Sequence, residues 1–170
     1  KFGYSKEMFL NENSSMVNTD NAIKLFTQWA EFWNLEKSVL IEKSPPNILK
    51  TRFLQALFPN SSFINVIRHP IAVSLATIRK WNDIQFNEAI ENWLICNETF
   101  LKDSKYLDTS YTIKYETFVK DPDNCLQEIY SLLGLKYKFS SINVKKNVND
   151  KYFKIWKNIK NEIIKNKEMS

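Results

Sequence analysis

Glycine is scarce in this chain, with Gly3 and Gly134 as the two glycines among 170 residues. Glycine-rich loops that hold phosphate need several glycines within a few positions, because their backbone approaches the ligand closely. Neither common form of such a loop can therefore lie within this sequence. An enzyme built on one would carry it outside these residues.

Histidine, cysteine and long apolar runs are scarce as well. The single histidine, His69, and the two cysteines, Cys96 and Cys125, lack the spacing of metal ligands, so no metal is predicted. Both cysteines fall inside predicted helices and are interpreted as small buried hydrophobic residues. Apolar runs reach only a few residues, far short of the roughly 20 that span a bilayer, so no transmembrane segment is expected.

The composition is that of one globular domain covering residues 1–170. Hydrophobic residues make up 44% and aromatic residues 14%, enough for a real core. The net charge of +5 is compatible with an anionic ligand. Lysines near the carboxyl terminus alternate with acids and amides, which favours a solvated helix face over a nucleic-acid surface. No nucleic-acid partner is therefore predicted.

Hydrophobic periodicity and turn residues predict alternating helices and strands. One helix begins with Thr19 or Asp20 as N-cap, and another has Asp121 as N-cap, Pro122 in its first turn and Gly134 as terminator. Strands are expected at 39–42, 63–67 and 111–115, and helices at about 20–33, 47–58, 71–81, 87–104, 122–133 and from about 150 onward. This order predicts an α/β fold with a parallel sheet flanked by helices.

Two of these predicted strands are each followed by a cation. Lys43 comes after the first, and Arg68 comes directly after Phe63 to Ile67. The helix between the strands is long enough to carry the chain back to the end of the sheet where the first strand began, so we expect the strands to be parallel neighbours. Lys43 and Arg68 would then lie at the same sheet edge and form an anion site.

Three ordered blocks of sequence carry a family resemblance. They read EKSPPNILKTRFLQALFPNSSFINVIRHPIAVSLATIRKW, then TIKYETFVKDPDNCLQEIYSLLGL, then NDKYFKIW. Together they resemble the sulfotransferases that use 3'-phosphoadenosine-5'-phosphosulfate (PAPS), in the bacterial branch related to tyrosylprotein and glycan sulfotransferases. The resemblance implies a fold like that of the phosphate-loop NTPases. It also implies a domain lacking its first strand-loop-helix unit, which binds the 5'-phosphosulfate, and therefore N-terminally incomplete.

Phosphate contacts follow from the resemblance. Arg68 matches the family arginine that holds the 3'-phosphate of the nucleotide, a role that suits a guanidinium fork before a helix amino terminus. The family serine eight residues later is replaced by Ala76. Ser74 and Thr77 flank that position and are alternative phosphate ligands, or their hydroxyls face solvent or bond their own helix.

Lys43 matches the lysine of the family EKSP or EKTP motif, and is the candidate catalytic cation. An ammonium there would stabilise charge on the departing bridge oxygen and on the sulfuryl oxygens. The alternative is a strand-end lysine paired with an acid. Ser44 either assists at the phosphate or sulfuryl oxygens or begins a turn. Lys151 lies in a segment resembling the family's nucleotide-closing loop, where Lys145 and Lys146 are equal candidates.

The predicted function is transfer of a sulfuryl group from PAPS to a hydroxyl, or an amine, of a glycan or a protein tyrosine. A nucleotide kinase-like phosphate-loop enzyme and a non-catalytic protein that binds PAP or a sulfated glycan are the alternatives. The family resemblance is compatible with the cytoplasm for a bacterial protein and with the Golgi lumen for a eukaryotic one. Acceptor, oligomeric state and compartment stay open.

Overall fold

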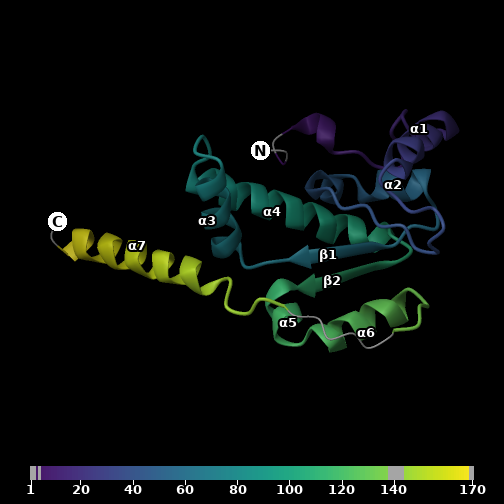
Figure 1. The fold of residues 1–170 in the computed structure, drawn as a ribbon. Coiled ribbons are helices and arrows are strands. Elements are labelled where there is room, and N and C mark those ends of the chain that lie inside the picture. The colour runs from purple at the N-terminus through teal and green to yellow at the C-terminus, as the bar shows by residue number, and fades with distance from the viewer. Residues whose placement is uncertain (1–2, 4, 138–143, 169–170) are drawn as a thin grey trace. The chain divides into compact units, whose positions relative to one another are not determined.

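The fold is described by a computed structural model that covers residues 3, 5–137 and 144–168, the side chains beyond residue 161 excepted. The chain divides into unit 1, Lys1–Asn65 with Ile95–Tyr111, and unit 2, Val66–Leu94 with Thr112–Ser170. Strands β1 (Phe63–Ile67) and β2 (Ser110–Lys114) pair in parallel, and each begins in unit 1 and ends in unit 2 (Figure 1). Helix α4 (Phe86–Asp103) also passes from one unit to the other. The α/β class is thus confirmed.

Unit 1 is built around two helices, α1 (Thr19–Ala30) and α2 (Thr51–Leu57). Buried Phe53, Leu54 and Leu57 of α2 form its core, against which Leu25 and Trp29 of α1 pack. The 3-10 turns η2 (Lys6–Met8), η3 (Pro45–Leu49) and η4 (Ser104–Tyr106) complete the unit. Core residues recur at i, i+1 and i+4 of α2, so one face of this short helix supplies most of the burial.

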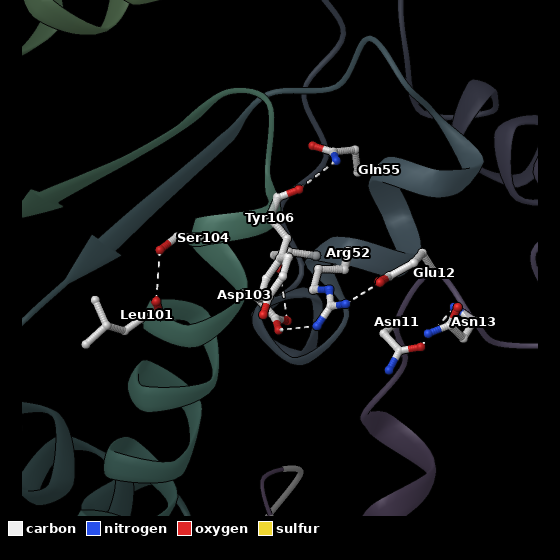
Figure 2. A network of polar contacts seen from close by, with 10 residues as sticks. Asn11, Glu12, Asn13, Arg52, Gln55, Leu101, Asp103, Ser104 and Tyr106 are labelled. Carbon is white, nitrogen blue, oxygen red and sulfur yellow. Dashed lines mark hydrogen bonds and ion pairs between the residues drawn. The ribbon is translucent and has the colours of Figure 1, made fainter.

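A partly exposed polar network around Arg52 joins three segments of unit 1 (Figure 2). The Arg52 guanidinium pairs with Glu12, lies 3.8 Å from an Asp103 carboxylate oxygen, and covers the Tyr106 ring at 4.2 Å. Burial raises the pKa of Asp103, although Arg52 and the Thr51 hydroxyl favour its ionised form. Arg52 is therefore the charge that makes a half-buried Asp103 tolerable.

Unit 2 contains α3 (Pro70–Lys80), α5 (Tyr115–Lys120), α6 (Pro122–Leu132) and α7 (Asp150–Glu168). Ala72 and Leu75 of α3 pack with Tyr152 of α7 in its core. Phe86 and Trp156 stack beside them with ring centroids 5.5 Å apart. Helix α7 is therefore held to α3 through its first two turns.

The strand predicted at 39–42 was wrong. Residues 39–44 are an extended connection, and β1 pairs with β2 instead. Val39 and Ile41 are 40% and 77% exposed, and the Ile41 carbonyl accepts a hydrogen bond from Trp33 Nε1 at 2.8 Å. A strand needs a neighbour for its backbone groups, and the described residues supply none here. The predicted sheet edge shared by Lys43 and Arg68 is accordingly not formed by two paired strands.

Several boundaries also differ from prediction. The helix expected at 47–58 is split into η3 and α2 by Lys50, whose φ of −145° is not helical. Asn18 is the N-cap of α1, because its side chain accepts from the Asn21 amide. Tyr115 begins the unpredicted helix α5 rather than ending β2.

The end signals of α6 were read correctly. Asp121 caps the helix by accepting from the Asn124 amide, and Pro122 occupies its first turn. Gly134 has φ +65°, and the Leu135 amide donates back to the Tyr130 carbonyl at 2.8 Å, a left-handed helix end. Cys96 and Cys125 are buried free thiols in helices, as predicted. No helix in the described part of the chain is long and apolar enough to cross a membrane.

Candidate functional site

The candidate site begins where β1 ends. Arg68 follows the last strand residue, and His69, with φ −48° and ψ 128°, turns the chain into α3. Pro70 then starts the helix, where its fixed φ suits the first turn and its missing N–H costs nothing. This local sequence places a half-buried guanidinium just before a helix amino terminus.

Arg68 is held in a defined orientation within unit 2. Its Nε and Nη2 both donate to Asn149 Oδ1, at 2.7 and 2.5 Å. The guanidinium carbon lies 4.9 Å from the Tyr115 ring centroid and 5.5 Å from that of Tyr152. Trp93 Nε1 donates to the Arg68 carbonyl at 3.0 Å. The side chain is therefore ordered before any ligand binds.

Asn149 also forms a hydrogen bond with an acidic residue, Glu116. Its Nδ2 donates to Glu116 Oε1 at 2.6 Å, and the His69 amide donates to the same oxygen at 3.1 Å. Burial opposes ionisation of Glu116, but these hydrogen bonds outweigh it and hold the pKa of that carboxyl below its ordinary value. Arg68, Asn149, Glu116 and His69 thus form a polar ring, the Arg68 ring.

Within the described residues, the Arg68 ring leaves part of the guanidinium free. Asn149 is only 7% exposed, yet its amide carries no charge, so it orients Arg68 without neutralising it. The hydrogen bonds to Asn149 use Nε and Nη2, and Nη1 has no partner in the part of the chain that the structure describes. A guanidinium that is oriented, flanked by two aromatic rings and, among these residues, not paired with a carboxylate is suited to bind an anionic group such as phosphate.

The other predicted residues of unit 2 have different surroundings. Lys151 is exposed and follows Asn149 by two positions, with its Nζ 4.8 Å from the Tyr152 ring centroid. Ser74 has an exposed fraction of 0%, and its Oγ has no hydrogen-bond partner among the residues that the structure describes. Thr77 is half-buried. A ligand would reach Ser74 only if neighbouring side chains moved, so of the two hydroxyls Thr77 is the more accessible.

Lys43 and Ser44 belong to unit 1, in the extended connection before η3. Both are exposed, and Ser44 lines a pocket of about 470 Å³. The structure therefore groups Arg68, Ser74, Thr77 and Lys151 in one unit, and Lys43 with Ser44 in the other.

Sequence reasoning did not assign Asn149 a role. It lies 81 positions from Arg68, and no spacing pattern links an amide to an arginine at that distance. From the family resemblance, Tyr115 and Glu116 are expected to be scaffold residues first and ligands second. The one available signal was that all three occur in sequence blocks shared with the resembled family.

Comparisons with known proteins agree with the α/β fold. A family described as "Sulfotransferase family" matches residues 8–139. A solved structure described as "Sulfotransferase Domain from the Curacin Biosynthetic Pathway" aligns with 68% of this chain at a TM-score of 0.56 and 23% identity, a likeness of fold. The chain spans 44% of that structure's length. A search of curated proteins found no match.

Proposed function

This chain belongs to the sulfotransferase family, and we propose that it takes part in transfer of a sulfuryl group from PAPS to an acceptor hydroxyl. The observation that carries the proposal is the Arg68 ring. It offers an oriented guanidinium with no direct carboxylate partner among the described residues, at the end of β1, where the family resemblance expects the 3'-phosphate. The residues present therefore fit the phosphate of that nucleotide.

Each residue has a distinct proposed role. Arg68 binds the 3'-phosphate through its guanidinium, and Asn149 positions Arg68. Thr77, Ser74 and Lys151 are the candidate supporting ligands. When bound, PAPS supplies a sulfuryl group carried on a phosphate leaving group, and the Lys43 ammonium would stabilise charge that develops there. The acceptor is a hydroxyl, or an amine, of a glycan or a protein tyrosine.

Lys43 suits that role because it is exposed on an extended connection. No carboxylate partner occupies its ammonium in the part of the chain that the structure describes. A lysine on a flexible stem can follow charge as it moves during the reaction, whereas a fixed ion pair would hold it away. Its removal should therefore slow transfer while leaving nucleotide affinity nearly unchanged.

Calorimetric titration with PAP, the desulfated nucleotide, tests the phosphate role. Arg68→Ala should weaken binding by about 2 kcal/mol, or roughly thirtyfold, as for a lost charged hydrogen bond. Arg79→Ala is the matched control, because Arg79 is exposed in the last turn of α3, the helix that follows Arg68. Equal PAP affinities for the parent chain and Arg68→Ala would refute the proposed function.

A further inference from the structure

A pocket of about 470 Å³ lies wholly within unit 1. One side of it is apolar and is formed by α1 and α2, with Leu25, Trp29, Phe53, Leu54 and Leu57 among the lining residues. Pockets of this size bind small molecules and bury most of their surface. A ligand here would therefore place a compact apolar body against these side chains.

The polar lining residues of the pocket, here called its rim, include two lysines. Lys24 is an exposed residue of α1, and Lys50 is a half-buried residue between η3 and α2. Neither forms an ion pair within the described part of the chain. The rim acid, Glu42, accepts a hydrogen bond from Asn47 Nδ2 at 3.3 Å. The rim therefore has an excess of positive charge that an anionic substituent would satisfy.

The pocket also reaches the proposed catalytic segment. Ser44 is one of its lining residues and follows Lys43 directly in the chain. Lys43 itself is not a lining residue, whereas Glu42 and Ser44 on either side of it are, so its side chain starts about 3.8 Å from the Cα of a residue that a bound ligand touches. An acceptor hydroxyl must come near the cation that stabilises the departing group. Position in the chain thus connects this pocket with the transfer step.

We propose that this pocket binds the acceptor, and that the acceptor is a small amphipathic alcohol or phenol with an anionic substituent. The inference rests on the proposed function and changes its acceptor from a glycan or a protein tyrosine to a small molecule. The leucine and aromatic side chains bind the apolar body, and Lys24 and Lys50 bind the anionic group. A neutral oligosaccharide fits less well, because it would leave the lysines unpaired and the leucines poorly covered.

The test is an NMR titration of the whole chain without nucleotide, using 4-hydroxyphenylacetate and its neutral analogue 4-hydroxyphenethyl alcohol. The acid should bind at least fivefold more tightly than the alcohol. Combined Lys24→Met and Lys50→Met substitution keeps the apolar stems and should abolish this preference. Lys37→Met is the matched control, because Lys37 is exposed in unit 1 and does not line the pocket.

A variant at Met16 gives a second reading that does not depend on removing lysine. Met16 lines the pocket and is 43% exposed, so Met16→Asp should fold normally and weaken binding of the acid by repulsion. Equal affinity for acid and alcohol, no binding of either, or an equal effect of Lys37→Met would overturn the inference. Displacement of the acid by PAP would also overturn it, since the pocket would then take the nucleotide.

Failure of the two proposals can be told apart. If Arg68→Ala leaves PAP affinity unchanged while the acid still binds in a lysine-dependent way, the proposed function fails and the ligand class of the pocket stands. If PAP binding depends on Arg68 and the acid shows no lysine dependence, the donor site stands and the acceptor inference fails.

Discussion

Replacing Asn149 by Asp tests why an amide holds Arg68. The two side chains have nearly the same shape, so Asp can still accept from Nε and Nη2, which donate to Asn149 at 2.7 and 2.5 Å. Asp also replaces the Nδ2 donor by an oxygen that faces Glu116 Oε1, at the 2.6 Å contact, and repulsion between the two carboxylates loosens the hold on Arg68 in the same direction. The substitution adds one negative charge beside the guanidinium. If Arg68 binds phosphate, that charge should compete directly with the ligand.

The expected effect can be worked from Coulomb's law. A phosphate on the far side of the Arg68 guanidinium would lie roughly 6 Å from the new carboxylate, where two unit charges repel by about 3 kcal/mol at an effective dielectric constant of about 20. Solvent screening at this half-buried site reduces that figure by about half. Asn149→Asp should therefore weaken PAP binding at least tenfold, since about 1.4 kcal/mol corresponds to that factor.

The assay is calorimetric titration with PAP at neutral pH on three variants. Asn149→Ala removes the hydrogen bonds to Arg68 without adding charge. Its PAP affinity should lie between that of the parent chain and that of Asn149→Asp. Asn60→Asp changes the net charge equally at an exposed turn residue of unit 1 and should bind PAP as the parent does. If Asn149→Asp bound PAP as tightly as the parent, the amide would be a structural link only and the reasoning would be refuted.

Two further predictions concern stability. Arg52→Leu should destabilise the fold by roughly 2 kcal/mol in urea unfolding, because it leaves the half-buried Asp103 without its cation; Lys102→Leu, which removes an exposed pairing with Glu98, should cost less than about 1 kcal/mol. Equal losses would contradict a special role for Arg52. The lowered pKa of Glu116 means that the Arg68 ring contributes its full stability above the ordinary carboxyl pKa, near 4.5, and loses it as pH falls through the folded value. The parent's stability advantage over Glu116→Gln should thus be constant above about pH 5 and shrink below it, and a pH-independent difference would contradict this linkage.

Local signals were sufficient to predict several elements. Helix α6 carries its own start and stop residues, and Gly134 supplies a left-handed turn that other residues adopt with strain. Strand β1 was placed at its observed bounds, Phe63–Ile67, because a short apolar run lies between turn residues. The position of Arg68 directly after this strand was predicted for the same reason, because it depends only on where β1 ends.

The strand predicted at 39–42 failed because strand formation is not a local property. Its apolar residues match those of β1 in type, yet a strand forms only where a neighbour receives its backbone hydrogen bonds. Asn149 escaped prediction for a related reason, since its partner lies 81 positions away. An apolar pattern shows which residues a segment could bury, whereas burial and pairing both depend on which distant segment folds beside it, and Val39 and Ile41 stay exposed.

The Arg68 ring links the proposed phosphate site to the attachment of α7. Asn149 immediately precedes that helix, and its carbonyl accepts from the Tyr152 amide at 2.9 Å, so the residue that orients Arg68 also caps α7. Tyr152 in turn packs on α3 and faces the guanidinium. A ligand stabilises whatever its binding site requires to be folded. An anion bound to Arg68 would consequently hold the first turn of α7 against α3, and loss of that turn would release Arg68.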